Sequence, residues 1–342
     1  MDKDFNWVVG LDAHTRSCDA CILDPRAEPQ AAFKFPTSGR NLIKVAEQYP
    51  RAVFILEESV MTQWFVETLT PHVADVFVSE PKRNKWMTSG AKSDRIDAEK
   101  LAKMYLIGSL RRVYHSLDAS RVEFKRTVQY RDSLVRETTR LKNEIKATFC
   151  RYGVVADGST VYRPGLRDEW MRRLPAATQY RLKHFYQRLD MLKDQEREAY
   201  RTMIGQSLSF PEIHSFTKVP GVGDIGACVF SAYLQTPHRF PDKHYLWNYA
   251  GLKVITKSSA GKFVSRPYLS RTGVMPLKTM SRSAFLGALN YCHGKNEIAE
   301  HYRRHFNSSK NPTGARLATQ RKILAILLHL WKTGEEYKTN KV

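Results

Sequence analysis

The first 110 residues alternate short apolar segments with amphipathic ones, and this alternation restricts the fold more than any other feature of the chain. Short apolar, β-branched segments are typical of strands, whereas apolar residues spaced three and four apart indicate helices. In chain order the segments predict three strands, a helix, a strand, a helix, a strand and a helix, which is the order of an α/β sandwich. The predicted strands are 5–11, 17–23, 30–35, 51–56 and 73–78, and the predicted helices are 41–48, 64–69 and 93–107.

A long helical segment follows the α/β pattern. Few glycines or prolines interrupt residues 116–150, and Leu134, Leu141 and Ile145 recur at spacings of seven and four. This spacing predicts a long amphipathic helix with a basic outer face, and it is compatible with a coiled coil. A second helical segment, 178–204, is expected to pack antiparallel to the first.

A third unit is expected from about residue 211. The turn Pro220-Gly221-Val222-Gly223 opens a predicted helix, which is typical of a helix-hairpin-helix element that offers backbone N–H groups to a phosphate. Residues 251–273 are loop-rich, and further helices are predicted at 275–291 and 313–331. We therefore expect an α/β domain at 1–112, a helical linker domain at 113–210 and a mostly helical C-terminal domain at 211–342.

The charge is divided unevenly along the chain. The 342 residues carry 55 Lys and Arg against 34 Asp and Glu, a net charge of +21. Residues 1–110 hold 14 basic and 15 acidic side chains, whereas residues 111–210 hold 21 and 12 and residues 211–342 hold 20 and 7. A basic excess of this size indicates a polyanionic partner, of which nucleic acid is the usual one. The near-neutral first third fits a catalytic domain that gathers carboxylates around a metal.

Composition excludes several other classes of protein. No apolar segment approaches the ~20 residues that a membrane span needs, and the start of the chain lacks the pattern of a secretory signal. Five cysteines in a chain of this length argue against a disulfide framework. Cys18-x-x-Cys21 lacks a second ligand pair, and no acid lies between His301 and His305 as a zinc protease motif requires. The cysteine count therefore predicts a reducing compartment, and we expect the protein in the cytoplasm.

Four carboxylates in the first 110 residues stand where a metal site would need them. Asp12 ends the first predicted strand, and Glu57 follows the fourth. Asp94 and Asp97 are three residues apart, so a helix places both on one face. Acids at neighbouring strand ends and on a crossing helix can hold two Mg²⁺ ions for phosphoryl transfer. The alternative is that they are surface carboxylates with helix-capping roles.

The order of the motifs resembles that of a known family. Val9–Asp12, Phe54–Glu57 and Lys92–Ala98 resemble the DEDD motifs of the insertion-sequence 110 transposases, the class that includes the pilin-gene invertases. Val219–Gly226 is similar to the family's Pro-Gly element, and the segment Asn248–Leu252 with Ser258-Ser259 is similar to its serine segment. The tail Ala315–Leu328, which contains Arg321–Leu324, resembles its closing helix, so the resemblance covers nearly the whole chain.

This resemblance implies a fold, a reaction and a set of site residues. The first domain would have the RuvC-like, RNase H-type fold, with Asp12, Glu57, Asp94 and Asp97 as catalytic metal ligands for two Mg²⁺ ions. Ser259 would be the nucleophile that becomes covalently joined to DNA. The match leaves Ser258 as an alternative one residue away, and Glu58 as an alternative to Glu57.

The resemblance also implies a prokaryotic, nucleoid-associated protein, and it implies partners. They are double-stranded donor and target DNA, and a structured noncoding guide RNA (a bridge RNA) that pairs with both DNAs. The long helices suggest a homodimer through a coiled coil, and strand exchange between two DNA sites favours a tetramer. The residues expected to contact nucleic acid are Arg131, Arg136, Arg140, Lys142, Lys146, Gly221, Gly223, Lys257, Lys262 and Arg271.

Two other functions use the same features. A hydrolytic, RuvC-like Holliday-junction nuclease would use the same four acids with water in place of the serine. A non-catalytic DNA-binding protein would need only the basic surface, and for it Asp94→Ala would leave function unchanged.

Overall fold

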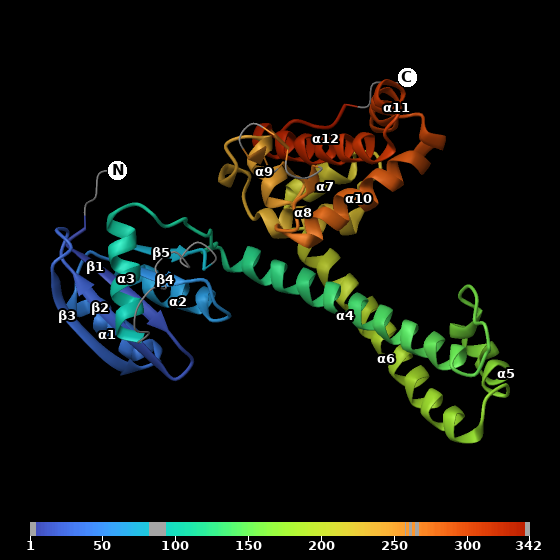
Figure 1. The fold of residues 1–342 in the computed structure, drawn as a ribbon, viewed down its shortest axis with the longest axis horizontal. Helices are drawn as coiled ribbons and strands as arrows, with labels where there is room; N and C mark the ends of the chain where they lie inside the picture. Colours follow the sequence, from blue (N-terminus) through green and yellow to red (C-terminus); the bar gives the residue numbers. More distant parts are fainter. Residues whose placement is uncertain (1–4, 82–93, 257, 260–261, 264–266, 339–342) are drawn as a thin grey trace. The chain divides into compact units, whose positions relative to one another are not determined.

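The computed structural model describes residues 5–81, 94–256, 258–259, 262–263 and 267–338 of the chain. It divides the chain into two compact units, Met1–Leu117 and Asp118–Val342, and each is described by itself below (Figure 1). The boundary after Leu117 lies five residues from the predicted one after 112. The further boundary predicted after 210 falls inside the second unit, where helices on both sides of it contact one another. It stays a prediction.

The first unit is built on a five-stranded mixed sheet with the order β3-β2-β1-β4-β5. The strands are β1 (Trp7–Ala13), β2 (Ser17–Leu23), β3 (Pro29–Pro36), β4 (Ala52–Glu57) and β5 (Asp75–Ser79). The first three pair antiparallel, and β4 and β5 run parallel to β1. This confirms the predicted strand and helix order and the RNase H-like arrangement of the domain.

Helices cover both faces of the sheet (Figure 1). On one face α1 (Gly39–Gln48) and α2 (Thr62–Leu69) pack on the strands, and on the other face α3 (Asp94–Leu106) does so. Leu11 belongs to the first of these cores, and Ile55 belongs to the second. Burial on both faces explains why the central strands are apolar without alternation.

The helix α3 crosses the central strand β1 at Gly10. A Cβ atom on Gly10 would lie 1.9 Å from the carbonyl oxygen of Ala98 and 3.0 Å from the backbone nitrogen of Ala102. No other residue type leaves room for this approach, because every other one carries a Cβ. The glycine therefore fixes how closely the start of α3 can approach the end of β1.

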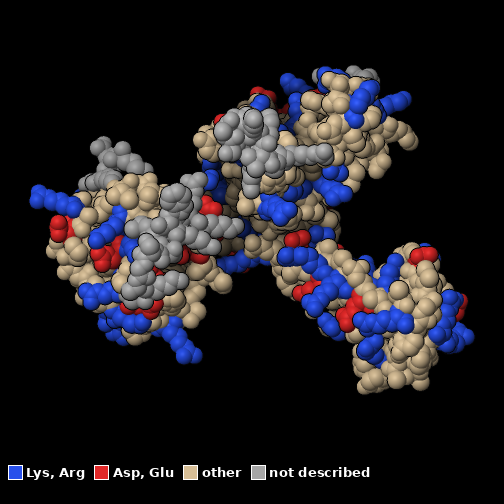
Figure 2. Space-filling view, viewed as in Figure 1, with Lys and Arg blue, Asp and Glu red and all other residues tan. Residues whose placement is uncertain are grey.

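Two long helices dominate the start of the second unit. α4 (Ala119–Cys150) and α6 (Ala176–Ser207) pack side by side and antiparallel within one chain, as the sequence predicted (Figure 1). Leu134, Leu141 and Ile145 are buried in their shared core, and basic side chains lie along the outside (Figure 2). The pair is an intramolecular hairpin. A coiled coil between subunits is not seen and stays a prediction.

The short helix α5 (Arg167–Met171) packs on the core of the long pair. The other helices surround a second apolar core. They are α7 (Pro211–Thr217), α8 (Asp224–Leu234), α9 (Lys243–Tyr249), α10 (Met275–Asn290), α11 (Glu297–Ser309) and α12 (Pro312–Thr333). Short 3-10 turns are η1 (Thr70–His72), η3 (Thr160–Tyr162), η4 (Pro164–Leu166), η5 (Pro237–Arg239) and η6 (Tyr291–Gly294). The sequence did not predict α11. The predicted loop-rich region contains two short ladders, β6 (Val254–Ile255) with β9 (Tyr268–Leu269), and β7 (Ser258–Ser259) with β8 (Lys262–Phe263).

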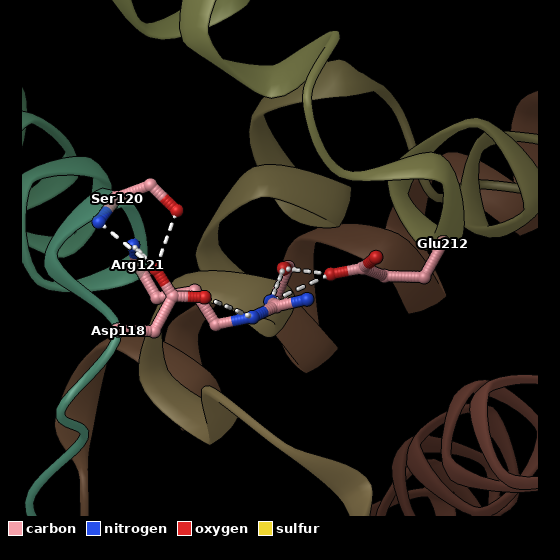
Figure 3. Close-up of polar contacts among 5 residues, drawn as sticks. Asp118, Ser120, Arg121 and Glu212 are labelled. Atoms are coloured by element: carbon pink, nitrogen blue, oxygen red, sulfur yellow. Dashed lines mark hydrogen bonds and ion pairs between the residues drawn. The ribbon is translucent and has the colours of Figure 1, made fainter.

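Arg121 ties the start of α4 to this core (Figure 3). Its Nη1 donates to Oε1 of Glu212 at 2.9 Å, and Ser231 Oγ donates to the same oxygen at 2.7 Å. The Glu212 side chain is only 8% exposed. The guanidinium also lies 4.7 Å from the ring centre of Phe210 and 5.4 Å from that of Trp331. A largely buried charge thus has both a cationic partner and a hydroxyl donor.

Gly10→Ala is expected to lower the free energy of unfolding by about 1–3 kcal/mol, because the new Cβ forces α3 away from β1. Gly39→Ala is the matched control, since a Cβ there meets its nearest atom at 3.8 Å, and it should change the value by less than about 0.5 kcal/mol. Calorimetric melting of both variants measures this. Equal stability of the two variants would contradict the close-approach argument.

Arg121→Met is expected to cost about 2–4 kcal/mol, because it leaves the buried Glu212 carboxylate without its cation. Adding Glu212→Gln should restore part of the loss, since the uncompensated charge is then gone. Arg126→Met is the control: this exposed arginine pairs only with Glu123 one turn away, and we expect less than about 0.5 kcal/mol. Urea denaturation compares the three, and a loss in the control as large as in Arg121→Met would refute the assignment.

Candidate active site

Two of the predicted acids lie at the same edge of the sheet. Leu11 of β1 is the register partner of Leu56 of β4, so Asp12 and Glu57 are the next residues on two neighbouring parallel strands. Gly10 faces α3, and Ile55 packs in the core on that side. Because side chains alternate along a strand, Asp12 and Glu57 belong to the α3 side as well.

The other two predicted acids lie on α3. Asp94 and Asp97 lie in the first turn of this helix, which the Gly10 contact holds against β1. Asp12, His14 and Asp94 each offer a ligand atom, and these atoms lie within 4.8 Å of one another. Asp97 and Glu57 lie outside this trio. Of the four predicted acids, the structure thus brings Asp12 and Asp94 together in this trio.

The sequence analysis missed His14. Its Nε2 lies 3.2 Å from Oδ2 of Asp12, at hydrogen-bonding distance. The signal was present, because a histidine two residues after a strand-end aspartate is placed to reach the same site. Imidazole nitrogen and carboxylate oxygen together form a donor set that divalent cations use.

The electrostatics of Asp12 favour a bound cation. Burial raises the pKa of Asp12, and the negative charges of Asp94 and Asp97 raise it further, whereas His14 lowers it. The Asp12 side chain is 24% exposed, so a partly desolvated carboxylate lies beside two other carboxylates. A divalent cation held by these oxygens would relieve both the desolvation and the repulsion. The residues therefore fit a hard divalent metal.

A lysine and a further aspartate adjoin the acids, and the sequence analysis missed both. Asp19 of β2 is the register partner of Asp12 and is almost completely buried. The ammonium of Lys34 lies 3.1 Å from Oδ2 of Asp19 and 3.4 Å from Oδ2 of Asp94. The hydrogen bond to Asp19 raises the pKa of Lys34. Lys34 thus supplies a positive charge between two acids of this site.

The strand register gives Glu57 and Glu58 different positions relative to Asp12. Glu57 is the last residue of β4 and pairs with Ser79 of β5. Glu58 lies beyond the strand, and its N–H donates to the Ser79 carbonyl at 3.0 Å. Glu57 therefore has the position beside Asp12, whereas Glu58 is one residue further along the chain.

The predicted serines lie in the second unit. Ser258 and Ser259 form β7, in which Ser258 pairs with Phe263 and Ser259 with Lys262. Ser259 is thus the second residue of β7. Arg271 is exposed after β9, and Lys257 lies outside the described residues.

The residues expected to contact nucleic acid on α4 differ in their surroundings. Arg136 and Arg140 are exposed, and Arg136 pairs with Asp132 at 3.7 Å. The ammonium groups of Lys142 and Lys146 each lie 5.8 Å from the ring centre of Tyr162. Arg131 is mostly buried and faces α6.

The predicted phosphate-binding turn has a packing role in the structure. Gly221 has φ +85°, and a Cβ there would lie 2.1 Å from the carbonyl oxygen of Ala284 on α10. Gly223 precedes the first residue of α8, and its own surroundings are open. Asp224 begins α8 and places a carboxylate at the end of the helix that would attract an anion. Phosphate contact at Gly221 and Gly223 stays a prediction.

Comparisons with known proteins give matches in both units of the chain. Residues 9–153 match the DEDD domain of IS110 elements, described as "Transposase", and residues 213–302 match the "Transposase IS116/IS110/IS902 family". A putative transposase of Sinorhizobium fredii, y4pF/y4sB, is 24% identical over 324 residues, which cover 91% of this chain and 81% of that protein. Within the described residues no helix is long and apolar enough to cross a membrane. The chain belongs to the IS110 family of transposases, enzymes that transfer phosphoryl groups of DNA in the transposition of insertion sequences.

Proposed function

We propose that this transposase cuts and rejoins DNA with Mg²⁺ held by Asp12, Glu57, Asp94 and Asp97, and with Ser259 as a covalent nucleophile. The proposed metal site rests on the ligand atoms of Asp12, His14 and Asp94, which lie within 4.8 Å of one another at the start of α3. His14 joins the four acids as a ligand or as a hydrogen-bond partner of Asp12. The bound cation supplies charge neutralisation at the scissile phosphate.

The serine step conserves the energy of the phosphodiester. The Ser259 hydroxyl attacks phosphorus, a bond from serine oxygen to phosphorus forms, and the bond to the leaving DNA oxygen breaks. The hydroxyl proton passes to that leaving oxygen. A hydroxyl of a second DNA end then attacks the phosphoserine and releases Ser259 unchanged, so strands are rejoined without ATP. Ser258 is the alternative nucleophile.

We further propose that base pairing with a noncoding guide RNA selects the donor and target DNA. The net charge of +21 supports a large nucleic-acid partner, and the motif order supports a partner of this kind. Exchange between two DNA sites would use a homodimer that assembles into a tetramer. The acids and the serine lie in different units of the chain, so a complete site requires one of each.

Mg²⁺ is expected to raise the melting temperature of the protein unless Asp12 is changed. At a free Mg²⁺ concentration 100 times the Kd, the wild type should gain about 2.7 kcal/mol of stability. Asp12→Asn should gain almost none, since it removes a carboxylate of the trio. Glu67→Gln, an exposed change on α2 at the opposite face of the sheet, should behave as the wild type. Calorimetry measures this, and a full Mg²⁺ shift in Asp12→Asn would refute the site.

The raised pKa of Asp12 sets the sign of two pH effects. Protonation competes with the cation, so the affinity for Mg²⁺ should fall as the pH drops through that raised pKa. Without cation, the ionised carboxylate costs the folded state stability above that pKa. Asp12→Asn should therefore melt no lower than the wild type at pH 7 in EDTA. A clearly lower melting temperature would contradict the burial argument.

A covalent adduct between protein and DNA is expected when the full chain is mixed with Mg²⁺, DNA spanning an element junction, and RNA transcribed from the element's flank. Denaturing gels and peptide mapping should place the adduct on Ser259. Ser259→Ala and Asp12→Asn should abolish it, and Ser258→Ala is the matched control that should retain it.

The other outcomes of this trapping assay decide between the rival functions. An adduct on Ser258 would move the nucleophile by one residue. Cleavage without an adduct would overturn the serine step and support the hydrolytic junction nuclease. DNA binding that never leads to cleavage, with Asp94→Ala as active as the wild type in every assay, would support the non-catalytic protein.

A further inference from the structure

A basic groove runs between the two long helices of the second unit. It has a volume of about 500 Å³ and lies where Arg131 of α4 faces α6. Figure 2 shows Lys and Arg side chains gathered along this helix pair. The residues that line the groove are Arg131, Lys193, Glu196, Arg197, Tyr200 and Arg201.

Acidic side chains compensate only part of the positive charge of this groove. Four of the lining residues are basic and one is acidic. Arg197 pairs with Asp194 beside it. Lys193 and Arg201 make no ion pair with any residue that the structure describes. The groove therefore presents a concentrated positive field to solvent.

Arg131 is held in the groove with unused donors. Its side chain is only 15% exposed, and its Nη2 lies 3.6 Å from Oε1 of Glu196, which is longer than a hydrogen bond. The Nε–H group is buried and meets no acceptor within the described part of the chain. Burying a guanidinium without full pairing is costly, so an incoming anion would offset a cost already present in the fold.

The positive charge extends beyond the groove along the helix pair. Burial lowers the pKa of Lys193, and the like charges of Lys142, Arg167 and Arg197 lower it further, against the opposing effect of Asp190. Lys193 of α6 is thus close enough to Lys142 of the neighbouring helix α4 for their charges to interact. A row of cations along a helix pair fits a linear polyanion better than a small compact anion.

A second groove on the same helix pair provides a contrast. It has a volume of about 380 Å³ and contains one basic and one acidic side chain. Its lining residues are Arg126, Thr127, Tyr130, Gln195, Glu198, Ala199 and Thr202. Of these two grooves, the Arg131 groove therefore carries the larger excess of basic side chains.

We propose that the Arg131 groove binds the phosphodiester backbone of a nucleic-acid strand, with Lys193, Arg197 and Arg201 as phosphate contacts beside Arg131. Contacts of this kind fix position and orientation and carry no sequence information. The inference rests on the proposed function only in taking nucleic acid as the partner, and it requires neither the metal nor the serine.

The test measures binding of the full chain in EDTA, so that catalysis plays no part. Fluorescence anisotropy gives the Kd for a labelled DNA duplex and for an RNA duplex of the same sequence, over a series of KCl concentrations. Lys193→Gln/Arg201→Gln removes two cations that make no described ion pair. It should weaken binding about ten- to hundredfold and reduce the slope of log K against log salt by about two.

The control removes the same total charge elsewhere in the second unit. Arg126→Gln/Arg173→Gln changes two exposed arginines that pair with Glu123 and Glu169. It should leave the slope nearly unchanged. Arg131→Gln, checked for folding by its melting temperature, should lower the slope by about one. If the groove variants lower the slope with DNA alone, with RNA alone or with both, this result identifies the kind of nucleic acid that the groove binds.

Two results would overturn the proposal. The first is a slope of log K against log salt that stays unchanged in Lys193→Gln/Arg201→Gln with both nucleic acids. The second is an equal decrease of the slope in the control pair, because net charge alone would then explain the effect. These results are separate from those on the proposed function. A protein that forms no serine adduct can still bind through the groove, and a normal recombinase with an unchanged slope would refute the groove alone.

Discussion

The contact between α3 and β1 at Gly10 is the constraint on which the candidate metal site depends. Asp12 is fixed by the sheet, but Asp94 comes from a helix more than 80 residues later in the chain. The two carboxylates meet because α3 can approach β1 to a distance that a Cβ at position 10 would prevent. A residue with no functional group therefore sets the geometry of the groups that do the chemistry.

The acids repel one another, and the fold contains partial compensation. Lys34 lies between Asp19 and Asp94, and His14 lies beside Asp12. These two side chains stabilise the cluster only in part, since burial and the neighbouring carboxylates still raise the pKa of Asp12. A site that costs stability in this way is common where a protein holds a cofactor, because binding then repays the cost.

The two units differ in net charge. The first carries the acids and is close to neutral, whereas the second carries nearly all of the excess positive charge. On the long helix pair of the second unit, one groove has four basic and one acidic lining residue, and another has one of each. Arg121 shows how that pair is anchored, through a buried carboxylate on α7 and two aromatic rings.

The sequence by itself determined the order of strands and helices in the first unit, the antiparallel long helices, and the positions of Asp12 and Asp94, because periodicity and strand ends are local properties. It did not find His14, Asp19, Lys34 or the basic side of α6. Those depend on register between strands and on which helix faces meet, which link residues distant in the chain. Tertiary structure also decided that Gly221 packs against α10, since only the folded chain shows how close that helix comes.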